Sequence, residues 1–309
     1  MSVDLSIIVP LYNEEKNVDL LYRSIVRIID PLEIPCEMLF IDDGSRDGTF
    51  MKSRQLAEND PRLRVIKFRK NYGQTPAMAA GIEHARGKIL ITMDGDLQND
   101  PADIPKFIEK INEGYDIVCG WRHKRQDKLI TRKIPSVVAN WLIGKITGVP
   151  IKDNGCSLKA YRAEIMKSIP LYSDMHRFIP AMTSMAGTEI AEIKVNHHPR
   201  RFGVSKYGIT RIYKVMIDVL VIKILLSFSV RPLRLFATAG IVSLLVAILM
   251  LTESVTGLFV GEEMNFMAAS GALLFCILSF FFVLIGLLGE LVLKTGNFPD
   301  LFQLKAKTE

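Results

Sequence analysis

The sequence predicts an α/β protein whose N-terminal two thirds form a mostly parallel sheet, followed by a two-helix membrane hairpin. Apolar runs alternate with helix-like segments over the first 120 residues, polar clusters follow several of those runs, and two long uncharged stretches lie near the C-terminus. At 309 residues the chain is longer than one average domain. One large domain with an appendage is therefore expected.

The alternation of elements in the first part of the chain is typical of βαβ units. The apolar runs predict strands over residues 5–9, 37–41, 63–68, 88–93 and 115–119. Helical spacing of apolar residues predicts helices over 14–29, 48–58, 74–86 and 101–113, the last capped by Asp100. Strands at this spacing with intervening helices indicate a parallel sheet, whose ligands bind at the C-terminal ends of the strands.

Two uncharged stretches predict the hairpin. Residues 235–252 and 264–289 carry no charge, and a membrane-spanning helix needs about 20 apolar residues. Two buried core helices are the alternative, but the length, the all-round apolarity and the short acidic link favour membrane spans. Arginines precede the first span, lysines follow the second, and the link holds only glutamates as charged residues. The two spans predict a multi-pass protein of the inner (plasma) membrane, and the positive-inside tendency predicts a cytoplasmic N-terminal domain. No signal peptide is expected, because residues 1–4 lead straight into a strand-like run.

Polar clusters occur where four predicted strands end, at residues 10–15, 42–49, 94–98 and 120–122. Each cluster alone fits a turn with a helix cap. Together they bring several carboxylates to one sheet edge, where a bound cation relieves their repulsion. Asp94-Gly95-Asp96-Leu97-Gln98 offers the hard oxygen ligands that Mg²⁺ or Mn²⁺ prefers, although an Asp-Gly-Asp also makes an ordinary turn.

Two basic segments, residues 121–135 and 197–207, are either solvated loops or phosphate-holding flaps. Residues 209–231 are amphipathic and fit a helix in the membrane interface, with a core helix as the alternative. The net charge of +6 suits anionic partners. The four cysteines have no metal-type spacing and are assigned no role.

These clusters, in this order, resemble the family 2 inverting glycosyltransferases of the GT-A fold, which is Rossmann-like. The subgroup they resemble is the polyprenyl-phosphate (dolichyl- or undecaprenyl-phosphate) sugar transferases, typified by dolichyl-phosphate mannose synthase. The resemblance covers residues 4–210. It implies a GT-A domain over 1–208, an amphipathic interface region over 209–231, and the transmembrane hairpin with a cytoplasmic tail over 232–309.

The resemblance also implies roles for individual residues. Those that would hold the nucleoside are Pro10, Tyr12, Glu14 and Asp43, with Asp94 beside the nucleotide and sugar. Those that would hold Mg²⁺ or Mn²⁺ are Asp96 and Gln98. Those that would contact the donor diphosphate and the lipid phosphate are Arg122, Arg132, Arg200 and Lys206.

The implied reaction is inverting transfer of a sugar from a GDP- or UDP-linked donor to polyprenyl phosphate at the cytoplasmic membrane face. A lipid phosphate is already anionic at neutral pH, so the reaction needs no dedicated general base. No nucleic-acid partner is expected, and a homo-oligomer is compatible with the hairpin. Asp153 is either an additional catalytic acid or a turn aspartate before a strand.

Other classes fit the sequence less well. A processive polysaccharide synthase would carry Gln-x-x-Arg-Trp, but neither Trp121 nor Trp141 follows an arginine. A non-catalytic membrane scaffold would be expected to lose metal ligands or phosphate-binding arginines, and both are present. A dehydrogenase is disfavoured because no Gly-x-Gly-x-x-Gly follows the first strand.

Overall fold

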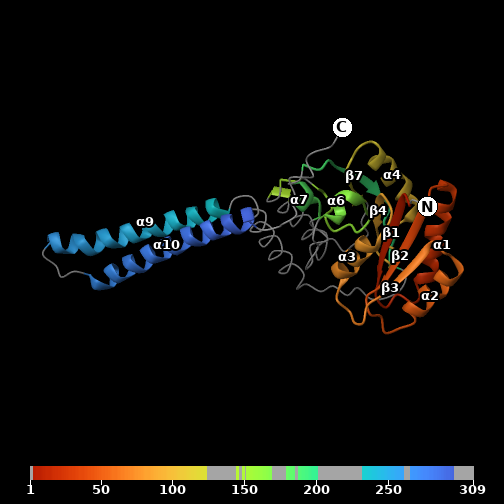
Figure 1. Cartoon of the computed structure of the whole chain (residues 1–309), viewed down its shortest axis with the longest axis horizontal. Helices are drawn as coiled ribbons and strands as arrows, with labels where there is room; N and C mark the ends of the chain where they lie inside the picture. The colour runs from red at the N-terminus through yellow and green to blue at the C-terminus, as the bar shows by residue number, and fades with distance from the viewer. Residues whose placement is uncertain are drawn as a thin grey trace. The chain divides into compact units, whose positions relative to one another are not determined.

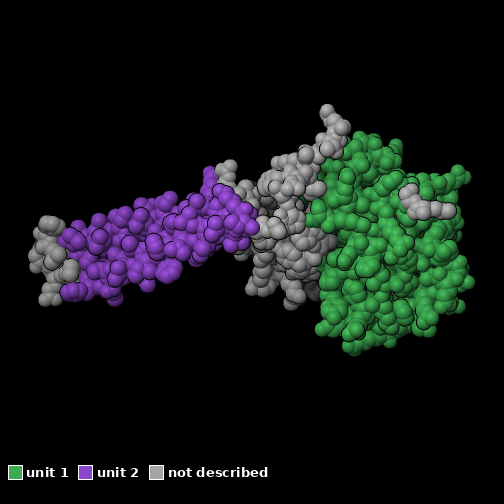
Figure 2. Space-filling model, in the orientation of Figure 1, with its two compact units in different colours: residues 1–219, 300–309 green, residues 220–299 purple. Residues whose placement is uncertain are grey.

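The computed structural model describes residues 3–123, 144–145, 148–149, 151–168, 179–184, 187–200, 232–260 and 265–295. The chain divides into two compact units, one of residues 1–219 with 300–309 and one of residues 220–299 (Figure 2). The first unit contains the predicted sheet, and the second contains the two apolar helices.

A mixed sheet with the order β3-β2-β1-β4-β6-β5-β7 forms the centre of the first unit. Its strands in the described residues are β1 (Leu5–Leu11), β2 (Cys36–Asp42), β3 (Leu63–Lys67), β4 (Ile89–Thr92), β5 (Ile117–Arg122), β6 (Lys159–Arg162) and β7 (Ile190–Val195). Only β6 runs antiparallel to its neighbours, β4 and β5. The predicted mostly parallel sheet is therefore confirmed.

Helices cover both faces of this sheet, and Figure 1 shows α1 and α3 on opposite sides of it. The α-helices described in this unit are α1 (Val18–Ile29), α2 (Thr49–Asn59), α3 (Gln74–His84), α4 (Ile104–Asn112), α6 (Ala163–Lys167) and α7 (Ile179–Ser184). Short 3-10 turns, η1 (Asp30–Leu32) and η2 (Pro101–Asp103), adjoin α1 and α4. Asp100 caps η2 as predicted, because its carboxylate accepts from the backbone N–H of Ala102 at 3.0 Å.

The core lies in two layers, one on each face of the sheet. Ile7 of β1 belongs to the layer that includes α1 and α4, whereas its neighbour Ile8 belongs to the layer that includes α3. Successive side chains of a strand point to opposite faces, so a strand that is covered on both sides must be apolar throughout. This double burial explains the continuous apolar runs in the sequence.

The strand order reverses at β1, which lies between β2 and β4. The chain moves outward from β1 through β2 to β3 and then returns to the other side of β1 as β4. A crevice forms at such a switch point, outside the carboxyl ends of the strands. The topology therefore brings the loops after β1, β2 and β4 to one edge of the sheet.

In the described residues, the second unit contains α9 (Pro232–Val260) and α10 (Phe266–Thr295), which lie side by side (Figure 1). Both are long and apolar enough to cross a membrane, and only 17% of each candidate span is buried. Large apolar side chains are exposed, for example Leu249 at 68% and Met267 at 84%. The contact between the helices uses small residues: a β-carbon on Gly240 of α9 would lie 3.2 Å from the carbonyl oxygen of Ser279, and one on Gly286 of α10 would lie 3.1 Å from Cα of Leu233. This exposure disfavours the alternative of two buried core helices.

The first helix extends beyond the predicted span of residues 235–252. Its candidate membrane segment runs from Pro232 to Thr256. This segment includes the charged residues Arg234 and Glu253, which flank the uncharged stretch of residues 235–252. A charge near the end of a span does not interrupt helical hydrogen bonding, because long side chains reach the interface.

Candidate active site

The Asp-Gly-Asp loop after β4 lies directly against the end of β1. A β-carbon on Gly95 would lie 2.3 Å from Cδ2 of Leu11 and 3.3 Å from the carbonyl oxygen of Pro10. Only glycine permits this approach. The residues predicted to hold the nucleoside and those predicted to hold the metal are therefore neighbours at the switch point.

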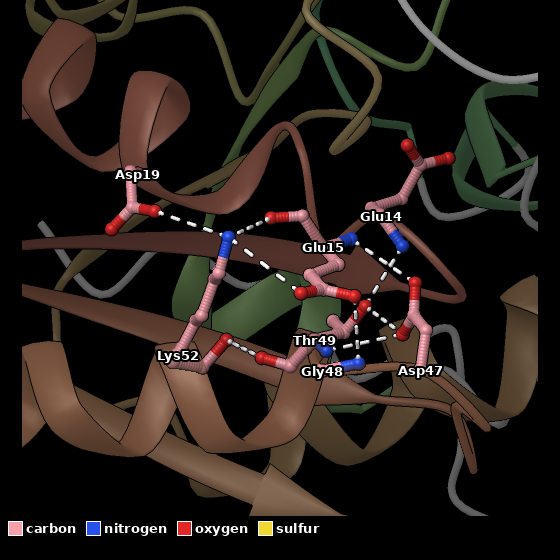
Figure 3. A network of polar contacts seen from close by, with 8 residues as sticks. Glu14, Glu15, Asp19, Asp47, Gly48, Thr49 and Lys52 are labelled. Carbon is pink, nitrogen blue, oxygen red and sulfur yellow. Dashed lines mark hydrogen bonds and ion pairs between the residues drawn. The ribbon is translucent and has the colours of Figure 1, made fainter.

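The loops after β1 and β2 are joined by a network of hydrogen bonds, which we call the loop clasp (Figure 3). The N–H of Glu14 donates to the hydroxyl of Thr49 at 2.8 Å, and that of Glu15 donates to Asp47 at 3.2 Å. In return, the N–H of Gly48 donates to the carboxylate of Glu15 at 3.1 Å. Asp47 also accepts from the N–H and the hydroxyl of Thr49.

The charges in the loop clasp are compensated locally. Lys52 donates to the carbonyl oxygen of Glu15 at 3.1 Å and lies 3.7 Å from the carboxylate of Asp19. Burial raises the pKa of Asp47, but the hydrogen bonds from Thr49 and from the N–H of Glu15 outweigh it and lower that pKa overall. The loop clasp therefore holds the two predicted nucleoside loops as one body, and the carboxylate of Glu14 points away from it (Figure 3).

We expect Asp47→Ala to raise the KM for the nucleotide-sugar donor by about tenfold with a smaller effect on kcat. The variant removes the acceptor of three hydrogen bonds, and a charge-assisted bond of this kind contributes on the order of 1.5–3 kcal/mol. Steady-state kinetics with varied donor measure the effect. The matched control is Asp19→Ala, which removes an exposed carboxylate that meets the loop clasp only through Lys52. Equal KM values for the two variants would contradict a positioning role for Asp47.

Asp43, predicted to accept from the base, is buried and holds the loop that follows β3. One carboxylate oxygen accepts from the N–H of Tyr72 at 2.7 Å. The other accepts from the N–H of Gly73 at 2.9 Å and from the side-chain amide of Asn71 at 2.8 Å. The adjacent Gly44 has a φ of 67° and presses against the backbone of this loop. The contact with the base stays a prediction, and the observed role of Asp43 is to fix residues 71–73.

Asp94 is connected to the same loop through a residue that the sequence did not single out. The side-chain amide of Gln74, the first residue of α3, donates to the carboxylate of Asp94 at 2.7 Å. Because Gln74 directly follows Gly73, a continuous set of contacts runs from Asp43 to Asp94. The Gly-Gln pair at a helix start was the only signal for it in the sequence.

Asp96 is almost fully buried and forms an ion pair with Arg200. Its Oδ1 accepts from the N–H of Gln98 at 3.1 Å, and its Oδ2 accepts from Nη2 of Arg200 at 2.5 Å. The amide nitrogen of Gln98 donates to the carbonyl oxygen of His198 at 3.4 Å, which leaves its amide oxygen as the atom suited to a cation. The structure thus brings together three of the predicted site residues across more than one hundred residues of sequence.

Arg122, at the end of β5, forms a buried bidentate ion pair with Asp153. Its Nε and Nη2 donate to the two carboxylate oxygens at 2.7 and 2.8 Å. Burial lowers the pKa of Arg122, but the bonds to Asp153 outweigh it, so that pKa is raised overall. A β-carbon on Gly155 would lie 3.3 Å from this guanidinium. Asp153 is therefore the partner that orients Arg122 in the described part of the chain.

The donor set of this edge fits a hard divalent cation. Carboxylate and amide oxygens come from three residues of one five-residue loop, Asp94, Asp96 and Gln98. The ion pair with Arg200 shows that a positive charge can lie beside the carboxylate of Asp96. No group of three or more His, Cys, Asp or Glu suited to a metal occurs in the described part of the chain. Mg²⁺ commonly binds through one or two carboxylates and completes its shell with water and substrate phosphates.

Two predicted phosphate-binding residues, Arg132 and Lys206, lie outside the described residues, as does the predicted amphipathic segment 209–231. Pro10 and Tyr12 lie at the end of β1 and just beyond it, beside the loop clasp, with partly exposed side chains.

Comparisons with known proteins identify the family of this chain. Residues 6–169 match the model of glycosyl transferase family 2. A dodecaprenyl-phosphate galacturonate synthase of Rhizobium johnstonii is 43% identical over 244 residues, covering 78% of this chain and 72% of its own. An undecaprenyl-phosphate 4-deoxy-4-formamido-L-arabinose transferase of Photorhabdus laumondii is 35% identical over 299 residues, covering 95% of this chain and 90% of its own.

Among solved structures, the glucosyl-3-phosphoglycerate synthase of Mycobacterium tuberculosis in complex with Mn²⁺, UDP and phosphoglyceric acid aligns with a TM-score of 0.55. The match has 18% identity and covers 70% of this chain and 78% of that chain. At this identity the likeness concerns the fold, which confirms the predicted GT-A architecture. The family match spans more than half of the chain and confirms the predicted enzyme class: the protein belongs to glycosyl transferase family 2.

Proposed function

We propose that this glycosyltransferase moves a sugar from a nucleotide sugar to polyprenyl phosphate, with inversion, at the cytoplasmic face of the inner membrane. The observation that carries the proposal is the joint presence of a carboxylate and arginine site at the sheet edge and of two membrane-length apolar helices. The basic residues that flank the helices support the cytoplasmic orientation. Both relatives described above are named for polyprenyl phosphates.

The proposed reaction is a single displacement at the anomeric carbon. A phosphate oxygen of the lipid forms the new C–O bond while the bond to the donor diphosphate breaks, and the nucleoside diphosphate leaves with the electron pair. Because the attacking oxygen is already anionic, no proton has to be removed. The two phosphates repel each other, so cationic side chains must hold them near one carbon. Arg122, fixed by Asp153, and Arg200 are suited to this task.

Asp96 and Gln98, with Asp94 beside them, would hold a divalent cation. When bound, Mg²⁺ or Mn²⁺ would neutralise the diphosphate leaving group. The loop clasp and Asp43 would hold the nucleoside end of the donor in a fixed position relative to Asp94.

We propose a UDP-linked donor with a uronic or related sugar. The structural neighbour of the same fold was solved with Mn²⁺ and UDP-glucose, and the relative with 43% identity is named for galacturonate. The first donor to test is therefore UDP-galacturonate, with GDP-mannose and UDP-glucose as comparisons.

A donor panel tests this proposal. Purified full-length protein in detergent would be incubated with undecaprenyl phosphate, Mn²⁺ and each radiolabelled nucleotide sugar. Label that enters the organic phase from one donor supports the proposal and names the sugar. Absence of transfer from every donor, with donor binding still seen by calorimetry, would contradict the lipid-phosphate acceptor.

A further inference from the structure

The two roles assigned to the site conflict at one atom. Oδ2 of Asp96 accepts from Nη2 of Arg200 at 2.5 Å. A cation that takes this oxygen as a ligand lies beside the guanidinium and brings charge of the same sign, so the two repel each other there. Arg200 also has to reach a substrate phosphate if it is to assist transfer. Its bond to Asp96 and its use on a phosphate therefore compete with each other.

Both side chains are largely buried, so the loss of either partner has a large energetic cost. The side chain of Asp96 is 9% exposed and that of Arg200 is 24% exposed. A buried carboxylate without a partner is strongly destabilising, so some cation is needed beside Asp96 in every state. In the described residues Arg200 supplies that charge when no metal is bound.

The backbone around Arg200 is held independently of this ion pair. The N–H of His198 donates to the carbonyl oxygen of Gln98 at 2.9 Å, and the N–H of Asn196 donates to Asp103 at 2.7 Å. The imidazole of His198 lies 3.1 Å from the carboxylate of Asp100. These bonds tie residues 196–198 to the segment that follows the Asp-Gly-Asp loop. None of these bonds involves Asp96, so residues 196–198 would stay in place if the guanidinium of Arg200 moved away from that carboxylate.

We propose that Arg200 and the divalent cation alternate on Asp96, so that metal binding releases Arg200 toward the acceptor or donor phosphate. This inference rests on the proposed function, in which both the cation and Arg200 act on phosphates. It implies an order of events: the cation enters with the donor, and Arg200 then becomes available to the second phosphate. It also implies reciprocal coupling, since a phosphate that draws Arg200 away must strengthen metal binding by the same factor.

Direct measurement of Mn²⁺ binding tests the exchange without any turnover. The loss of the free Mn²⁺ signal in electron paramagnetic resonance would be titrated with full-length protein in detergent, without nucleotide. Arg200→Gln removes the competing charge and keeps a polar side chain, although a shorter one. We expect this variant to bind Mn²⁺ about tenfold more tightly than the parent protein, the effect expected from losing a charge-assisted competitor.

Two controls separate the exchange from a general effect of charge. Lys110→Gln removes the same charge from an exposed ion pair with Glu113 on α4, and its Mn²⁺ affinity should stay within about twofold of the parent, as for an exposed pair. The double variant Asp96→Asn with Arg200→Gln should lose the gain. Unchanged or weaker Mn²⁺ binding by Arg200→Gln would overturn the exchange, even if sugar transfer is observed. Failure of transfer with a tenfold gain in binding would instead overturn the proposed function.

Discussion

Replacing Asp96 by asparagine is expected to reduce kcat/KM for sugar transfer by about a thousandfold while leaving the fold intact. Loss of one preorganised electrostatic contact to a developing charge costs on the order of a hundred- to a thousandfold, and loss of a metal ligand acts on the same charge. The substitution keeps the size of the side chain and its hydrogen bond from the N–H of Gln98. Initial rates with saturating Mn²⁺ and varied donor would measure the effect.

The control for Asp96→Asn is Asp30→Asn. Asp30 has an exposed carboxylate that pairs with Arg62. Arg62 directly precedes β3, so this pair lies at the N-terminal ends of the strands, away from the candidate site. The Asp30→Asn variant should have nearly the same kcat/KM and thermal midpoint as the parent protein. Near-normal transfer by Asp96→Asn would exclude Asp96 as a metal ligand, whatever the control shows.

The second large effect is expected from Asp153→Asn, which should destabilise the first unit by about 3–5 kcal/mol, the cost of removing one partner from a buried ion pair. Asp153 is 3% exposed and Arg122 is 14% exposed, so solvent cannot replace the lost carboxylate. Arg122 would then be held less firmly, and kcat/KM should fall as well. Thermal unfolding followed by tryptophan fluorescence suits this test because Trp121 adjoins Arg122 in β5.

A matched substitution on the surface distinguishes the buried pair from any ion pair. Glu113→Gln breaks the pair with Lys110, in which both side chains are more than one third exposed. Such exposed pairs contribute little to stability because solvent screens them, so the midpoint should barely move. If Asp153→Asn behaves like Glu113→Gln in both stability and turnover, Asp153 is only a turn aspartate.

The fold could be predicted because the residue patterns that indicate each strand and helix lie within that element or directly beside it in the sequence. Strands buried on both faces leave continuous apolar runs such as residues 5–9, and the helix over Ile104–Asn112 begins after a capping aspartate and a proline. Helix boundaries were less predictable. The helix expected from residue 14 begins at Val18, because the preceding residues form a turn in which the N–H of Asn17 donates to the carbonyl oxygen of Glu14.

The predicted site residues within the described part of the chain lie toward one edge of the sheet, but their partners could not be predicted from the sequence. Asp47 lies 32 residues from Glu15, and Arg200 lies 104 residues from Asp96. No local periodicity or spacing records such a pairing, since it arises only when the sheet brings distant loops to one edge. Asn71 and Gln74 were missed for the same reason: apart from the Gly-Gln pair at the start of α3, nothing in the sequence marks these two amides until their acceptors are known.

We propose that the acceptor is a lipid phosphate, and a matched pair of acceptors separates this from transfer to a lipid alcohol. Undecaprenyl phosphate and undecaprenol have the same chain and differ only in the phosphate. With the donor identified by the panel, the account predicts a sugar-phospholipid product from undecaprenyl phosphate, with one nucleoside diphosphate released per sugar transferred, and no product from undecaprenol. Equal transfer to undecaprenol, or release of nucleoside diphosphate without any lipid product, would contradict it.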